Sequence, residues 1–265
     1  MIKSIITGCA VLTLSALAVT HAEFSYEQEL QQGCNKVKQY ASLGKKFYDQ
    51  KQYKKALENF QNQASWTAFC KANADETTVK FTDRDIEVAN NNVGLAYAKL
   101  GQPLWARAWF MLDEKSKSSQ FNLKQLPAPK ASNDLSGEYV RYSGFGEWDH
   151  ITVSRKQGQY AIGYSGVYMG LRSLIYGPNM GDFGTTMPTN AKQTIYKDQD
   201  CRIQLDFRTN AKLGNYIQVK QNEGESGCGF GHNVYADGTY LKVESGKLCT
   251  RQISQNPYPI RILPS

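Results

Sequence analysis

The sequence predicts an α+β protein in which helical hairpins precede a small antiparallel β-barrel or sandwich. In residues 23–117, apolar side chains recur three and four positions apart and glycine is rare, which is typical of helices that face a core. From about residue 134 onward, glycine and tyrosine become frequent and apolar residues alternate with polar ones, which is the period of a half-buried strand. A run of helices followed by a run of strands favours the α+β class.

Residues 1–22 have the features of a secretory signal peptide. A lysine near the start precedes an apolar stretch over residues 5–19, and Thr20-His21-Ala22 forms a small-x-small cleavage site. A lipoprotein cleavage box at residues 6–9 is the alternative, but too few apolar residues precede it to form the apolar core of a signal peptide. We therefore expect a cleaved signal, a mature chain that begins near residue 23, and a periplasmic or secreted location in a bacterium.

One spacing pattern occurs twice in the helical part, at an offset of fifty residues. Gly44, Phe47, Ala56 and Phe60 recur as Gly94, Tyr97, Ala106 and Phe110. A glycine lets a second helix approach closely because no Cβ stands in the way, and a small alanine opposite a large aromatic ring fills the gap between the helices. The pattern predicts two stacked helical hairpins, preceded by a further helix over residues 26–39.

The two copies, Tyr40-x2-Leu43-Gly44-x2-Phe47 with Ala56-x3-Phe60 and Val93-Gly94-x2-Tyr97 with Ala106-x3-Phe110, resemble the tetratricopeptide repeat. The resemblance covers about residues 38–117. Asn90 replaces the first aromatic residue of the second copy, neither copy ends in proline, and about sixteen residues are inserted near residues 71–85.

Tetratricopeptide repeats hold partners and rarely carry chemistry, so the resemblance implies a binding scaffold. In such a hairpin the first helix faces the partner. Carried over onto this chain, the implied binding positions are Lys38, Lys45, Tyr48, Asn91 and Lys99. Three lysines, an aromatic ring and an amide would suit an extended peptide that carries carboxylates.

Residues 118–133 are predicted to be a linker, because Pro127 and Pro129 favour extended chain. The remaining part, residues 134–265, is predicted to fold by itself. Its alternating segments include Ile151/Val153, Tyr160/Ile162/Tyr164, Ile203/Leu205/Phe207 and Ile217/Val219. Seven to nine short strands suggest closure into a barrel or sandwich, since closure hides the sheet edges.

The end of this part, with Cys201-x-Ile-x-Leu-x-Phe207, Ile217-x-Val219, Cys228-Gly-Phe-Gly231 and Asp237-Gly-x-Tyr240, resembles small β-domains of exported bacterial proteins. A few proteins of this style are proposed lysozyme inhibitors. The resemblance implies an alternative function, inhibition of an envelope hydrolase such as lysozyme, with a blocking loop near Ser165 to Tyr168. The corresponding alternative binding surface is Tyr164, Ser165 and Tyr168. Lysozymes are mostly basic, whereas this part of the chain is not acidic, so the charges of the two proteins argue against the inhibitor function.

Five of the six cysteines remain once the signal is removed, so at most two bridges form within the chain. Cys34 and Cys70 flank the turn of the first hairpin, which predicts that they pair. Cys201 opens one strand and Cys228 follows the next, so this pair is favoured over a bridge between Cys228 and Cys249. The cysteines form no CxxC or Cys/His arrangement, so we expect no metal site.

The formal net charge of +7 falls to +6 when Lys3 leaves with the signal, and the basic residues are spread along the chain. Nucleic acid is therefore not an expected partner. The mature chain also contains no further stretch that could cross a bilayer.

Few residues are candidates for catalysis. His150 and His232 are the only histidines outside the signal, and the common hydrolase and nucleotide-binding motifs are absent. Glu147 and Asp149 could form a carboxylate pair on one strand face, which leaves a cell-wall glycan hydrolase as a third hypothesis. The sequence favours an exported, non-catalytic protein-binding or assembly factor of the cell envelope, without cofactor, whose partner is a protein or peptide.

Overall fold

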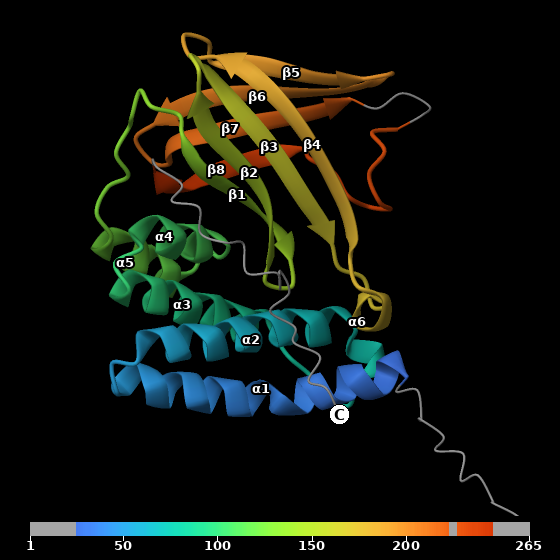
Figure 1. Cartoon of the computed structure of the whole chain (residues 1–265). Coiled ribbons are helices and arrows are strands. Elements are labelled where there is room, and N and C mark those ends of the chain that lie inside the picture. The colour runs from blue at the N-terminus through green and yellow to red at the C-terminus, as the bar shows by residue number, and fades with distance from the viewer. Residues whose placement is uncertain (1–24, 223–226, 246–265) are drawn as a thin grey trace, which may run out of the picture.

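The computed structural model describes residues 25–222 and 227–245 and confirms the predicted α+β class (Figure 1). A layer of helices is followed by an eight-stranded antiparallel sheet that curls into a nearly closed barrel. The predicted signal peptide and Cys249 lie outside these residues. Within them, no helix is both long enough and apolar enough to span a membrane.

The first hairpin consists of α1 (Tyr26–Asp49) and α2 (Tyr53–Ala72). Ser25 and Gln28 form a capping box at the start of α1, which satisfies backbone N–H groups that have no partner within the helix. A separate helix over residues 26–39 was expected, but α1 is continuous. No glycine turn or proline interrupts it, so the expected extra helix and the first helix of the hairpin are one.

The second hairpin consists of α3 (Asp83–Lys99) and α4 (Pro103–Met111). Thr82 and Asp85 form another capping box, and a proline occupies the first turn of α4, where its missing N–H costs nothing. The inserted segment between the hairpins contains a short 3-10 helix, η1 (Ala74–Glu76).

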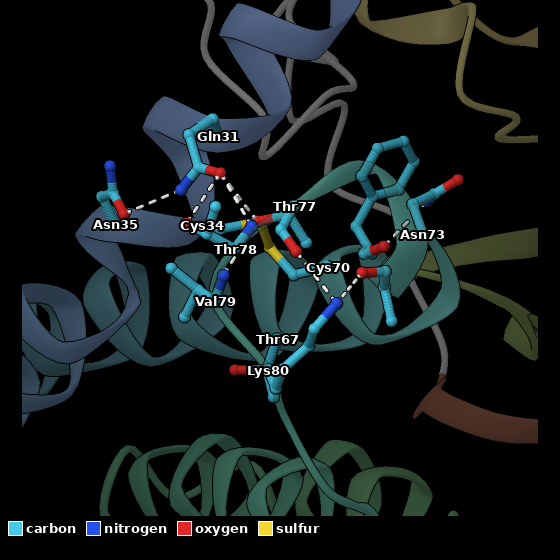
Figure 2. Close-up of a disulfide and its surroundings, with 12 residues drawn as sticks. Gln31, Cys34, Asn35, Thr67, Cys70, Asn73, Thr77, Thr78, Val79 and Lys80 are labelled. Carbon is cyan, nitrogen blue, oxygen red and sulfur yellow. Dashed lines mark hydrogen bonds between the residues drawn. A yellow bond between two sulfur atoms is a disulfide. The ribbon is translucent and has the colours of Figure 1, made fainter.

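The predicted Cys34–Cys70 disulfide joins α1 to α2, and the inserted segment lies across it (Figure 2). The side-chain oxygen of Gln31 accepts hydrogen bonds from the backbone N–H of Thr78, at 2.9 Å, and from the hydroxyl of Thr77, at 3.2 Å. The bridge and these bonds fix the insertion against the first hairpin.

The repeated glycines perform the packing role that the sequence predicted. A Cβ added to Gly44 would lie 2.4 Å from the ring of Phe60, and one added to Gly94 would lie 2.4 Å from the ring of Phe110. Each aromatic ring therefore occupies the space that a side chain at the glycine would need. Gly33 has the same relation to Trp66, so the first hairpin contains a second close approach.

The strands form a single sheet in the order β4-β3-β2-β1-β8-β7-β6-β5. The strand bounds are β1 Gly137–Gly144, β2 Glu147–Lys156, β3 Gln159–Tyr168, β4 Asn179–Pro188, β5 Gln193–Asp198, β6 Cys201–Asn210, β7 Gly214–Asn222 and β8 Gly238–Ser245, with a short helix α6 (Ser173–Tyr176) before β4. The two edge strands approach each other, and the hydroxyl of Thr194 donates to the carbonyl of Thr186 at 2.9 Å.

The alternating residues that predicted the strands fill the barrel. The buried core includes Ile151, Val153, Tyr160, Ile162, Tyr164, Ile203, Leu205, Phe207, Ile217 and Val219. The predicted Cys201–Cys228 disulfide is also present. It ties the start of β6 to the segment before β8.

The helices and the barrel share a core. The outer face of the barrel presents Val140, Trp148 and Val243, which are buried together with apolar residues of α2, α3 and α4. Phe145, in the β1–β2 turn, packs edge-on against Phe69 of α2 with ring centroids 5.0 Å apart. This hairpin turn reaches down to the helical layer (Figure 1).

The predicted linker over residues 118–133 is helical in its first half. Helix α5 (Lys117–Gln125) is capped by Ser116, whose hydroxyl accepts a hydrogen bond from the backbone N–H of Ser119. The hydroxyl of buried Ser119 then accepts a hydrogen bond from Asn91 of α3 at 2.9 Å. A short polar segment is thus held as a helix by contacts with α3 that its own sequence does not reveal.

Candidate functional site

The lysines that the repeat resemblance implies for binding are exposed, but they are divided between two helices. Lys38 and Lys45 are on α1, where Lys45 pairs with Asp49 at 2.7 Å. Lys99 is at the end of α3. Helix α2 packs against both α1 and α3 and lies between them (Figure 1), so the three lysines do not converge on one point.

The other two implied positions belong to the packing of the helices. The half-buried ring of Tyr48 packs against Tyr53 and Phe60, with ring centroids 5.3 and 6.3 Å apart. Asn91 is 6% exposed, and its amide bonds Ser119 and Asn122 of α5. A partner could reach Asn91 only if α5 moved away.

The segment expected to form a blocking loop is part of a strand. Residues 165–168 lie in β3, which pairs with β2 on one side and β4 on the other. Tyr164 points into the barrel and is 3% exposed, Ser165 is exposed, and Tyr168 is half-buried. A Cβ on Gly166 would lie 1.9 Å from the hydroxyl oxygen of Tyr164, so the glycine here serves the packing of the barrel.

The two histidines considered for catalysis are in different places. His150 lies on β2, and its Nδ1 is 2.6 Å from a carboxylate oxygen of Glu138 on β1. His232 lies in the segment before β8, where its carbonyl accepts a hydrogen bond from Asn179 at 2.8 Å. Neither histidine stands beside a serine or cysteine nucleophile in these contacts.

The carboxylate pair considered for glycan chemistry is buried. Asp149 is 1% exposed and accepts hydrogen bonds from Arg141 and from the N–H of Val167. Glu147 is 7% exposed, and one of its carboxyl oxygens has no hydrogen-bond partner in the described part of the chain. Burial raises the pKa of Glu147 to about 8. A polysaccharide could not reach either group without a large opening of the barrel.

The structure places a cleft of about 370 Å³ where the helical layer meets the β1–β2 hairpin. Its walls come from α2, α3, the end of α4 and the hairpin. The lining residues are Ala68, Lys71, Ala72, Ile86, Asn90, Leu112, Asp113, Tyr142, Gly144 and Phe145. Most of this surface is apolar and it contains few polar groups. Sites that bind small molecules have the same composition.

Asp113 is the polar group that distinguishes the cleft. Its carboxylate accepts a hydrogen bond from the amide of Asn90 at 2.9 Å. Burial raises the pKa of Asp113, and the nearby carboxylates Glu87 and Asp83 raise it further, against the opposing effect of Asn90. No lysine, arginine or histidine of the described residues forms an ion pair with it.

The neighbouring cations are already paired. Lys71 forms an ion pair with Asp83 at 3.0 Å, and Arg84 forms one with Glu87 at 2.6 Å. The half-buried carboxylate of Asp113 therefore faces an apolar cleft without a cation of its own.

Tyr142 forms a fixed wall of the cleft. Its ring packs edge-on against Trp148 and Trp109, with ring centroids 5.0 and 6.1 Å apart. Its hydroxyl accepts a hydrogen bond from the N–H of Gly146 at 2.9 Å, and burial raises its pKa to about 12. These contacts hold the ring in place, so this wall of the cleft is formed before any ligand arrives.

In the sequence, Asn90 is recognisable only as a departure from the repeat pattern. In the structure, this departure puts an amide beside Asp113 where the pattern would have an aromatic ring. No sequence motif marked Asp113 or Tyr142 as site residues. The fold brings them together from segments almost thirty residues apart. In the part of the chain that is described, no group of histidine, cysteine and acidic side chains has an arrangement that could hold a metal ion.

No protein-family model matches this chain, and no curated protein or solved structure matches it either. The functional argument therefore depends on the geometry above.

Proposed function

We propose that this protein is an exported, non-catalytic binding or assembly factor of the bacterial cell envelope. In this proposal the two hairpins are divergent tetratricopeptide-like repeats, and the barrel is their structural partner. The observation that carries the proposal is the cleft at their junction, where a carboxylate without a cation faces an apolar surface.

Export is supported by the predicted signal and by the two disulfides, since disulfides persist in oxidising compartments and are rare in the cytosol. A binding role is supported by rigidity. The disulfide, the glycine–aromatic contacts and the shared core hold the cleft walls in place, and a preformed site loses less entropy when it binds.

The chemistry of the cleft suits a basic side chain of a protein partner. A lysine or arginine has an aliphatic stem that can lie along Ile86, Leu112 and Phe145, and a cationic head that can reach Asp113. A hydrogen bond between two charged groups is roughly twice as strong as one between neutral groups. Binding of this kind requires no catalytic residue in the protein.

The test uses the mature protein and an array of peptides derived from envelope proteins. We expect peptides that bind to contain lysine or arginine, and to lose at least tenfold in affinity when that residue is replaced by norleucine or citrulline. Asp113→Asn should cause a similar loss, because it keeps the shape of the side chain and removes its charge. Asp75→Asn, at an exposed aspartate of η1, is the matched control.

Three results would contradict the proposal. Binding that survives Asp113→Asn and is lost in Lys38→Glu/Lys45→Glu would move the site to the surface of α1. Hydrolysis of purified cell wall by the protein would show that it is an enzyme, and inhibition of lysozyme would favour the inhibitor hypothesis.

A further inference from the structure

A second hollow lies between α4, α5 and the β6–β7 turn. Its volume is about 520 Å³. We call it the basic groove, and it is lined by Arg107, Met111, Glu114, Lys115, Gln120, Leu123, Lys124 and Lys212. In the segment 111–115, Met111, Glu114 and Lys115 line this groove, whereas Leu112 and Asp113 line the cleft.

The groove has an uncompensated positive charge. Four cationic side chains line it, against a single carboxylate. Lys212 pairs with that carboxylate, Glu114, at 2.6 Å. Among the described residues, no carboxylate lies within ion-pair distance of Arg107, Lys115 or Lys124, whereas Lys45 and Lys71 elsewhere on the helical layer do have such partners.

Arg107 is held in position for a ligand. One of its terminal nitrogens, Nη2, donates a hydrogen bond to the carbonyl of Pro127 at 2.8 Å. Burial lowers the pKa of the guanidinium, which remains charged in proteins because its usual value is above 12. A fixed guanidinium presents a planar fork that matches a carboxylate.

The apolar residues of the groove favour an acidic peptide over other anions. Met111 and Leu123 are half-buried apolar side chains, and Gln120 adds an exposed amide. An acidic peptide carries separate carboxylates with apolar side chains between them, which matches this mixture. A phosphate polymer has no apolar groups to place over Met111 and Leu123.

We propose that the basic groove binds an acidic peptide segment of a protein partner, with carboxylates on Arg107, Lys115 and Lys124 and apolar side chains over Met111 and Leu123. The inference is independent of the cleft, because none of the cleft's lining residues takes part. It also differs from the binding surface implied by the repeat resemblance, which lies on α1 and α3.

The experiment measures fluorescence anisotropy of a labelled peptide of alternating glutamate and leucine with the mature, full-length protein. A peptide in which glutamine replaces glutamate is the first control. Lys115→Gln/Lys124→Gln removes two exposed charges from the groove, and the matched control, Lys46→Gln/Lys54→Gln, removes two exposed charges from the first hairpin. Thermal melts of both variants establish that they remain folded.

We expect the groove variant to weaken binding of the glutamate peptide at least tenfold and the control variant to weaken it less than twofold. The groove variant should also flatten the dependence of affinity on salt, because fewer charge contacts remain to be screened. Equal losses in both variants would mean that only the overall charge matters, and would overturn the proposal.

Polyphosphate and vesicles that contain an anionic phospholipid are tested in parallel with the same variants. If either probe binds through the groove while the glutamate peptide does not, the partner is not a peptide and the proposal is wrong. No binding of the glutamate peptide at low salt would also overturn it.

Discussion

Glu147→Gln should stabilise the protein by an amount that depends strongly on pH. Glu147 opens β2 with its side chain 7% exposed, and burial raises its pKa from 4.5 to about 8. The folded state therefore holds a proton on this carboxyl over a range of pH in which the unfolded chain has released it. Under these conditions, stability falls as the pH rises from 4.5 to about 8.

The magnitude follows from the two pKa values. Each pH unit between them lowers the free energy of unfolding by about 1.4 kcal/mol. At pH 7 the loss is about 3 kcal/mol, and above pH 8 it levels off at about 5 kcal/mol. Glutamine has the shape of the protonated carboxyl and cannot ionise, so the variant avoids this loss.

The assay compares thermal melts of the variant and the parent protein from pH 4 to pH 9. We expect no difference near pH 4 and a higher melting temperature for the variant at pH 7, by roughly 6–12 °C for a chain of this size. Groups that titrate in both proteins, such as Asp149, cancel in the difference. Glu58→Gln, at an exposed position of α2, is the control substitution of the same type. A difference that stays constant between pH 5 and pH 8 would show that Glu147 is ionised and has a partner, and would refute the reasoning.

Three further predictions concern packing. Gly44→Ala should cost roughly 1–3 kcal/mol in denaturant unfolding because its methyl group would overlap the ring of Phe60, whereas Gly184→Ala, whose nearest neighbour would be 3.9 Å away, should cost less. Replacing Cys34 and Cys70 with alanine should lower stability by roughly 2–4 kcal/mol, and both cysteines should resist alkylation in the native, unreduced protein. The excised barrel, residues 134–265, should bind a hydrophobic dye because the helices no longer cover its outer face; a fragment that melts cooperatively without binding dye would contradict this.

The hairpins and strands could be predicted because their signals are local. Gly44 and Phe60 lie in adjacent helices, so spacing along the chain determines their contact. The alternation of Ile203 and Leu205 likewise reports which face of a strand is buried, whatever the rest of the fold. The two disulfides could be predicted because each cysteine lies at a recognisable position in a helix or near a strand.

The parts of the fold that depend on distant contacts could not be predicted. Helix α5 has a polar sequence between two expected domains, and a partner on α3, Asn91, fixes Ser119 within it. The same helix hides Asn91, which the repeat resemblance had placed on the binding surface. One unpredicted tertiary contact thus changed both the domain boundary and the candidate site.

The barrel packs closely on the helices because there are only two helical hairpins. A helical hairpin of this kind buries its apolar face only by stacking on a neighbour, and arrays usually need three or more repeats for stability. Here Trp148 of the barrel packs against Trp105 and Trp109 of α4, with ring centroids 5.8 and 5.4 Å apart. The barrel therefore buries apolar surface of the helices. The β1–β2 hairpin, which carries Trp148, also lines the cleft with Tyr142 and Phe145, so the contact that stabilises the helices also forms the candidate binding site.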